Sequence, residues 1–425
     1  MSKKGKGRGN FKMRKENGIT LVALIITIVV MLILVAVSIN VLVNSNLIDH
    51  AEKTGDAYAG AIKNEENFGN DGITVNGKDF SNYIPLTEIK AGERASETSK
   101  YQTAVIPKGF TVSNATGEKN VSTGLVIYDI PEGATVDWNN KTIKLPNESE
   151  IKEIKTAVNQ FVWIPVEVNR TTEPKDTETS IASFYRSKWS NNERTTVLST
   201  DYTEPYTDSS GNDYDSSTGI KKQIEDLTKS IYKYGGFYVG RYEAGSVEER
   251  TSSTTEVTTI GIKQDMYPYN YVKWGDSISD IGTEGAVYLS NSLYNSTKPN
   301  YGATSMLCTG ACWDSMLDFI KDEEHNVTSS TNWGNYSDSN YVINRGKYAV
   351  YSNGRLGKFQ NVNNKYPKAK DTKILLTTGS TEKNSAKNIY DVAGNCREWT
   401  TESYSSGNRV NRGRQLQQQW FFHSS

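Results

Sequence analysis

The sequence predicts an α+β protein in which one long apolar helix precedes a mixed, mostly β domain. Two observations lead to this prediction. The 25 residues from Ile19 to Val43 contain no charged side chain, and a helix of that length, at about 1.5 Å per residue, can cross a bilayer core of about 30 Å. Beyond residue 100 the chain carries short β-branched and aromatic runs bounded by Gly, Pro and Asn, which is typical of strands.

Composition excludes several classes of protein. The chain has 48 Lys and Arg against 49 Asp and Glu, a net charge of -1, so we expect no nucleic-acid binding by the chain as a whole. Three Cys are too few for a disulfide scaffold, and three scattered His exclude most His-built metal sites and triads. The charge is segregated, because residues 1–17 carry +6 and leave -7 for the remainder.

A basic leader, residues 1–18, precedes the apolar segment 19–43. The apolar run exceeds the roughly 7–15 residues of a secretory signal, and no small-residue cleavage site follows it. By the positive-inside tendency the leader stays cytoplasmic and everything after Val43 faces outward. We therefore expect a single-pass protein of the cell membrane, in contact with membrane lipid, with its C-terminal part extracellular.

The junction between leader and apolar helix is informative. The leader ends in ENG at residues 16–18, and the helix begins at once with ITLV at residues 19–22. This order resembles a type IV prepilin N-terminus, which implies peptidase cleavage after Gly18, N-methylation of Ile19, and other pilins as partners. The family usually has Glu at the fifth mature position, where this chain has Ala23, so filament assembly stays open. The alternative is an ordinary N-terminal membrane anchor.

Residues 44–68 continue the helical pattern, with apolar positions at three- and four-residue steps opposite charged side chains. We expect an amphipathic stem that continues the apolar helix; the alternative is a short juxtamembrane helix followed by linker. Residues 69–100 are mixed polar and contain four glycines, which predicts a linker with short strands.

Between residues 101 and 168 the pattern is mainly β. The segment Glu148–Val158 is the one stretch here with a helical pattern. The expected strands are Thr103–Ile106, Phe110–Val112, Gly124–Ile130 and Phe161–Val166.

Residues 169–222 form a Ser/Thr-rich insertion or long loop with few aliphatic side chains, and a second Ser/Thr run occupies residues 251–259. Such segments are ordinarily solvated loops. The alternative is that they rim a binding face.

Several later segments form an ordered set. They are FVWIPV at 161–166, YGGFYVGRYE at 234–243, a helical pattern over Thr304–Glu323, NIYDVAGNCREWT at 388–400 and NRVNRG at 408–413. In this order the segments resemble the formylglycine-generating enzyme (sulfatase-modifying factor) superfamily. The resemblance covers about residues 101–413 and implies an elaborated C-type-lectin-like fold, which non-catalytic display proteins also use.

The cysteines argue against catalysis. The related enzymes bind copper through two cysteines after the last Arg-Gly strand, but here no cysteine follows Cys396. Cys308 and Cys312 have a spacing that would place both on one helix face. A soft-metal site would need further ligands, and the sequence marks none nearby. We therefore expect no enzyme, with this pair serving as small helix-face residues.

The resemblance also implies calcium near residues 394–398, bound by backbone carbonyls and a carboxylate. Asn395 and Glu398 are the candidate ligands, since calcium prefers hard oxygen donors. No other cofactor is expected. From the residues alone we expect structural ion pairs at the sheet ends among Arg241, Glu243, Glu398 and Arg412.

Residues 414–425 break the composition of everything before them. One allowed coding of this tail, advanced by one nucleotide, gives Gly-Asn-Tyr-Asn-Ser-Ser-Gly-Ser-Ser-Thr-His. That reading restores a polar loop after Gly413. Our hypothesis is that the tail is frameshifted and that the chain is a truncated version of a longer protein.

The leading functional prediction is a membrane-anchored, surface-exposed, pilin-like protein that displays a lectin-like domain for ligand binding or adhesion. Recognition would use loops on a rigid β scaffold near Arg409–Arg412. One alternative is a formylglycine-generating-type oxidase acting on protein cysteine. The other is a structural pseudopilin of a secretion or DNA-uptake system. The sequence does not identify the extracellular ligand.

Overall fold

The structure is a computed structural model that describes residues 73–75, 78–80, 86–168, 184–195, 202–203, 218–253, 257, 259–277, 280–404 and 408–413. The predicted leader, apolar helix, stem and tail lie outside these residues, as do Gly18, Ile19 and most of the insertion. Within the described ranges, no helix combines the length and apolar composition that a bilayer crossing requires. The chain divides into two units at Asn70/Asp71, and all the described residues belong to the second unit, Asp71–Ser425.

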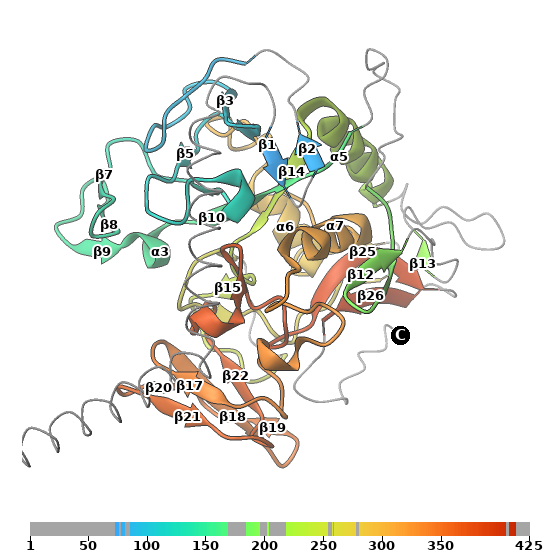
Figure 1. The fold of residues 1–425 in the computed structure, drawn as a ribbon. Helices are drawn as coiled ribbons and strands as arrows, with labels where there is room; N and C mark the ends of the chain where they lie inside the picture. The colour runs from blue at the N-terminus through green and yellow to red at the C-terminus, as the bar shows by residue number, and fades with distance from the viewer. Residues whose placement is uncertain are drawn as a thin grey trace, which may run out of the picture. The chain divides into compact units, whose positions relative to one another are not determined.

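The second unit is rich in short strands with few helices, which confirms the predicted α+β class at that level (Figure 1). Its α-helices within the described ranges are α3 (Ile154–Ala157), α5 (Ile220–Tyr234), α6 (Ala286–Leu293) and α7 (Gly310–Ile320).

A four-stranded antiparallel sheet forms the centre of the main hydrophobic core. Its order is β14 (Gly236–Gly240), β10 (Gln160–Pro165), β6 (Val126–Tyr128) and β5 (Thr111–Val112). Five of the six β10 residues are buried, which explains the nearly continuous apolar run in that strand. Helix α7 packs against β10 and contributes Trp313 and Phe319 to the same core.

Gly236 lets β14 pair closely with β10. A Cβ at this position would lie 2.4 Å from the Trp163 ring. The glycine therefore makes room for the large indole that covers the strand.

A second sheet joins strands that are distant in sequence. Its order is β13 (Tyr202–Thr203), β25 (Glu398–Tyr404) and β26 (Asn408–Arg412). The β25–β26 register is irregular between Trp399 and Ser403. Helix α7 also contacts β25, so it links this sheet to the central one.

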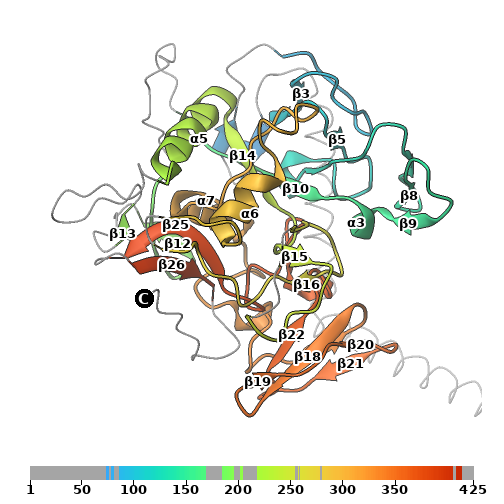
Figure 2. The same ribbon diagram turned by 180° about the vertical axis from the view of Figure 1, so that it is seen from behind.

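The segment Tyr341–Leu376 forms a lobe with its own small core of Ile343, Ile374 and Leu376. Figures 1 and 2 place its strands together at one end of the second unit. Strand β18 pairs with β19, β20 and β22, while β17 pairs with β21. The bounds are β17 (Tyr341–Ile343), β18 (Lys347–Ser352), β19 (Arg355–Leu356), β20 (Gln360–Asn361), β21 (Tyr366–Lys368) and β22 (Ile374–Leu376).

The remaining described strands form small antiparallel pairs or triplets. They are β1 (Ile73–Val75), β2 (Lys78–Phe80), β3 (Ser99–Tyr101), β4 (Ala104–Ile106), β7 (Thr135–Asp137), β8 (Thr142–Lys144), β9 (Ile151–Glu153), β11 (Lys188–Ser190), β12 (Glu193–Thr195), β15 (Gly245–Ser246), β16 (Tyr267–Pro268), β23 (Ser385–Ala386) and β24 (Ile389–Tyr390).

The four strands predicted between residues 101 and 168 are confirmed as β4, β5, β6 and β10. The helix predicted over Glu148–Val158 is wrong for its first half, because Ile151–Glu153 pairs with β8 and leaves only one helical turn, α3. The helix predicted over Thr304–Glu323 is real but shorter. The side chain of Thr309 accepts a hydrogen bond from the amide of Cys312 and caps α7, so the helix begins at Gly310.

Candidate functional site

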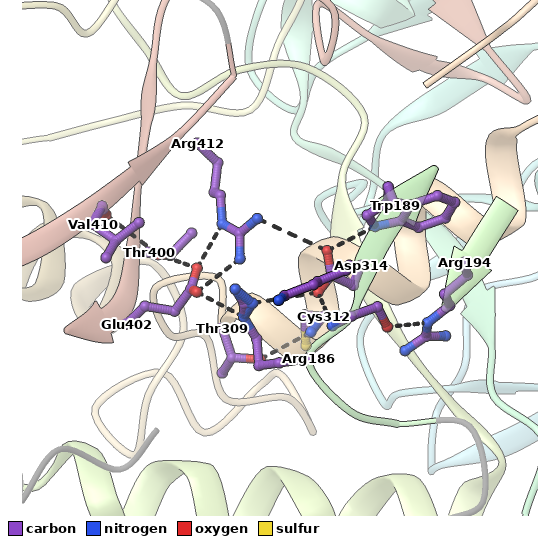
Figure 3. Close-up of polar contacts among 12 residues, drawn as sticks. Arg186, Trp189, Arg194, Thr309, Cys312, Asp314, Thr400, Glu402, Val410 and Arg412 are labelled. Carbon is purple, nitrogen blue, oxygen red and sulfur yellow. Dashed lines mark hydrogen bonds and ion pairs between the residues drawn. The ribbon is translucent and has the colours of Figure 1, made fainter. Parts of the chain in front are cut away.

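A buried ionic network lies where the β25–β26 hairpin meets α7 and the segment 184–195. Figure 3 shows the guanidinium groups of Arg186 and Arg412 turned toward the carboxylate of Glu402. Arg186 Nε lies 2.6 Å from Glu402 Oε1, and the carboxylate side chain is fully buried. Arg412 donates from Nε and Nη2 to the two Glu402 oxygens, at 2.7 Å each. This two-pronged contact is the strong form of an arginine–carboxylate pair.

Asp314 on α7 completes the network. Its carboxylate accepts hydrogen bonds from the Ser187 amide at 2.7 Å and from Trp189 Nε1 at 3.1 Å. It also lies 3.5 Å from Arg186 Nη1 and 3.9 Å from Arg412 Nη1. Burial raises the pKa of Asp314, and the charge of Arg412 is the largest influence opposing that rise. Two cations and two anions therefore neutralise one another inside the protein.

Gly310 explains how this network fits against the first turn of α7. A Cβ there would lie 2.3 Å from Arg186 Nε and 2.4 Å from the Glu402 carboxyl carbon. The missing side chain lets the Glu402 carboxylate approach the helix N-terminus, where the helix dipole favours negative charge. The network thus fixes the β25–β26 hairpin to α7, because the Glu402 carboxylate of the hairpin, held by Arg412, fits the space that Gly310 leaves on the helix.

The fork geometry gives a testable prediction. We expect Arg412→Lys to lower the free energy of unfolding of the full chain by about 1–2 kcal/mol, because an ammonium cannot bind both Glu402 oxygens in this way. Urea titration in detergent, followed by tryptophan fluorescence, measures this. Arg355→Lys is the matched control, since Arg355 is exposed. If the urea midpoints of the Arg412→Lys and Arg355→Lys variants were equal, the two-pronged contact would not contribute to stability.

A second cluster consists of buried carboxyl groups. Glu243 accepts hydrogen bonds from Asn395 Nδ2 at 2.7 Å and from the Cys396 amide at 3.0 Å. Burial raises the pKa of Glu243 well above its usual value, and the neighbouring Asp391 and Glu398 raise it further. Burial likewise raises the pKa of Asp391 to about 7 and that of Glu398 to about 8. This cluster therefore favours protonated carboxyl groups.

The calcium prediction named Asn395 and Glu398. The Asn395 Oδ1 atom already accepts hydrogen bonds from Asn335 Nδ2 at 3.0 Å and from the Leu376 amide at 2.9 Å. Glu398 keeps one buried oxygen, Oε2, without a hydrogen-bond partner among the described residues. Within the same ranges no group of three or more His, Cys, Asp or Glu side chains is placed to hold a metal ion. Calcium binding stays a prediction. Of the two predicted ligands, only Glu398 keeps an oxygen without a hydrogen-bond partner among the described residues.

The predicted ion pairs form with different acids. Arg241 is 1% exposed and pairs with Glu118 at 3.0 Å. Arg412 lies opposite Glu398 in the strand register, but its side chain turns to Glu402. Sequence reasoning missed both acids, because Glu118 is 123 positions from its partner and nothing in the local pattern marks that contact.

Two of the three cysteines belong to the main core and its edge, and the third lies beside the acid cluster. The prediction that Cys308 and Cys312 share a helix face is wrong, because Cys308 precedes the Thr309 cap of α7. Cys312 is buried in the main core, and Cys308 packs against it. Burial raises the pKa of the Cys396 thiol well above its usual value, and Glu243 raises it further. A raised pKa disfavours the thiolate that nucleophilic or metal-binding chemistry requires.

Segment 184–195 is a structured part of the region that the sequence predicted as an insertion or long loop. It contributes Arg186 to the network and forms the hairpin β11–β12. The Lys-Trp-Ser and Glu-Arg-Thr runs around Asn191-Asn192, both with positive φ, are the hairpin signal that was available. Compared with protein-family models, with curated proteins and with solved structures, the chain matches none.

Proposed function

We propose that this chain is a membrane-anchored, surface-exposed, pilin-like protein that displays a ligand-binding or adhesion domain. The anchor part of the proposal rests on the sequence order of basic leader, Gly18 and the uncharged run from Ile19. The display part rests on the strand-rich second unit.

The observation that carries the binding role is the ionic network around Glu402. It ties the β25–β26 hairpin, α7 and segment 184–195 together through fully buried carboxylates. A scaffold fixed in this way holds the connecting loops in constant positions, which preorganises a recognition surface. Loops on a rigid scaffold are common carriers of binding function.

The same contacts favour binding over bond chemistry. The Arg186 and Arg412 forks are occupied by carboxylates, so they are committed to structure. The high pKa of Cys396 keeps that thiol protonated. At the hairpin, Arg409 of β26 stacks on the Trp274 ring at 3.8 Å, which holds this cation against the scaffold.

N-terminal mass spectrometry of the mature native protein tests the anchor. We expect a chain that begins at Ile19 and carries one methyl group on its amino terminus. Gly18→Val should block this cleavage, whereas Gly9→Val in the same leader should leave it intact. A native chain that retains Met1 and the lysine-rich leader would contradict the prepilin assignment.

Protease treatment of intact cells tests the display. We expect added protease to degrade the second unit while a cytoplasmic marker stays whole. A second unit that becomes accessible only after the cell envelope is opened would contradict surface display and favour the structural pseudopilin.

A further inference from the structure

The lobe formed by residues 341–376, here called the basic lobe, concentrates positive charge. It contains eight Lys and Arg residues and one Asp, for a net charge of +7. The whole chain has a net charge of -1 and residues 1–17 carry +6, so all other residues together carry -14. One small lobe is therefore strongly cationic in an otherwise acidic protein.

Three of the eight cations are committed within the protein. Lys368 is buried and donates to the carbonyl oxygens of Tyr336 and Ser339 at 2.6 and 2.7 Å. Arg345 pairs with Asp265 at 2.8 Å. Lys347 donates to a tyrosine hydroxyl at 2.6 Å.

The other five are exposed or half-buried, and none forms an ion pair with any residue that the structure describes. They are Arg355, Lys358, Lys365, Lys370 and Lys373.

Tight turns restrain the backbone next to three of these cations. Arg355 follows Asn353 and Gly354, whose positive φ values of 49° and 78° form the β18–β19 turn. Lys365 follows Asn364 with φ of 67°, and Lys370 precedes Asp371 with φ of 68°. Residues next to such turns have little backbone freedom, so the points from which these three side chains extend are fixed.

The cations lie toward both ends of strand β18. Arg355 is near its C-terminal end, while Lys365 follows β20, which pairs with the N-terminal end at Lys347. A strand of six residues spans about 20 Å. A small anion reaches one end only, but a polymer with repeated negative charges reaches both.

Exposed carboxamides accompany the charges. Asn344, Asn361 and Asn363 are exposed, and no side-chain hydrogen bond engages them among the described residues. A carboxamide both donates and accepts hydrogen bonds, which suits a ligand with neighbouring hydroxyl groups. Cations alone suit a charged ligand, whereas this combination suits a ligand that presents charge and hydroxyls together.

We propose that the basic lobe binds an acidic polysaccharide, a polymer whose sugar rings carry hydroxyl groups beside carboxylate or sulfate groups. For its extracellular setting the proposal rests on the proposed display function. Single-stranded DNA supplies charge but few hydroxyls, and a second copy of this chain supplies acidic side chains; both are outcomes of the test.

Fluorescence anisotropy with the full chain in nonionic detergent tests the proposal. The labelled probes are a heparin oligosaccharide and an alginate oligosaccharide. Neutral dextran, polyphosphate and a single-stranded oligonucleotide serve as competitors. We expect both acidic glycans to bind, affinity to fall as salt rises, dextran to be inert, and both charged competitors to be weaker than unlabelled glycan.

Two variants and one control localise the binding. Replacing the five uncommitted cations by Gln should weaken glycan binding about 10-fold or more. The triple variant Asn344→Ala, Asn361→Ala and Asn363→Ala should reduce the preference for glycan over polyphosphate without abolishing binding. The control replaces exposed lysines elsewhere by Gln and should bind normally. Its positions are Lys90, Lys108, Lys144, Lys188 and Lys383.

Four results would overturn the proposal. They are no glycan binding by the wild-type chain, an equal loss in the control variant, an oligonucleotide or polyphosphate that competes as well as glycan, and self-association that requires the same five cations. Each concerns the lobe in solution, so it is distinguishable from failure of the display function, which the protease experiment measures on cells.

Discussion

Replacing Arg241 by Met is expected to lower the free energy of unfolding by about 3–5 kcal/mol, because it leaves a buried carboxylate without its cation. Arg241 Nη2 lies 3.0 Å from Glu118 Oε1, and the two side chains are 1% and 3% exposed. Arg241 also donates to the Tyr128 hydroxyl at 3.1 Å. The pair therefore joins the segment between β5 and β6 to the chain just after β14, and the Tyr128 contact adds β6 itself.

A double variant separates the loss of the Arg241–Glu118 ion pair from the cost of leaving one buried charge unpaired. Glu118→Leu combined with Arg241→Met removes both charges, so it should recover much of the stability that the single Arg241 variant loses. Arg345→Met is a control of the same chemistry at a half-buried pair with Asp265, and it should cost about 1 kcal/mol or less. Urea titrations of the full chain measure all three variants. If Arg241→Met lowered the free energy of unfolding no more than Arg345→Met does, that result would contradict the expected cost of an unpaired buried carboxylate.

The acid side of the pH profile follows from the same pair. Burial alone would raise the pKa of Glu118, but the charge of Arg241 and the hydrogen bond from Tyr128 lower it to about 2. The unfolded chain has the ordinary value of 4.5. The stabilisation is therefore complete above about pH 4.5 and is lost as the pH falls toward 2.

Local patterns in the sequence were sufficient for several elements. The run of apolar residues around Trp163 predicts β10, because the signal for this strand lies entirely within consecutive residues of the chain. The pattern of α5 was equally available, since Ile220, Ile224, Leu227 and Ile231 recur at helical spacing, but the polar insertion before it concealed the helix.

The candidate site was less predictable, because its contacts join distant parts of the chain. Arg186 and Glu402 are separated by 216 positions, and no local pattern connects them. The predicted partners of Arg412 were wrong for a similar reason. The strand register places Glu398 opposite Arg412. The irregularity after Trp399 and the space left by Gly310 instead bring the Glu402 carboxylate to the Arg412 guanidinium.

The buried acid cluster of Glu243, Asp391 and Glu398 is expected to make the protein less stable as the pH rises. Burial raises the pKa of Asp391 from 3.8 to about 7 and that of Glu398 from 4.5 to about 8. Folded chains thus keep protons that unfolded chains release near pH 4. The free energy of unfolding therefore falls as the pH rises from about 4 to about 8. The shift at Asp391 alone corresponds to a loss on the order of 4 kcal/mol.

Two neutral replacements test this origin. Asp391→Asn and Glu398→Gln together should reduce the decline between pH 5 and pH 9, since neither amide ionises, and Glu243 accounts for the decline that remains. In the first replacement the side-chain carbonyl oxygen can still accept from the Gly379 amide, the hydrogen bond that Asp391 makes at 2.7 Å. Glu243 stays unchanged in this design, because both of its oxygens accept hydrogen bonds that a glutamine amino group would oppose.

Urea titrations at each pH measure the slope, which is independent of any constant cost of the substitutions. Glu132→Gln with Glu248→Gln is the control, because both acids are exposed, and it should keep the wild-type slope. An unchanged decline in the cluster variant would show that other groups cause it. A wild-type chain equally stable at pH 5 and pH 9 would contradict the predicted decline.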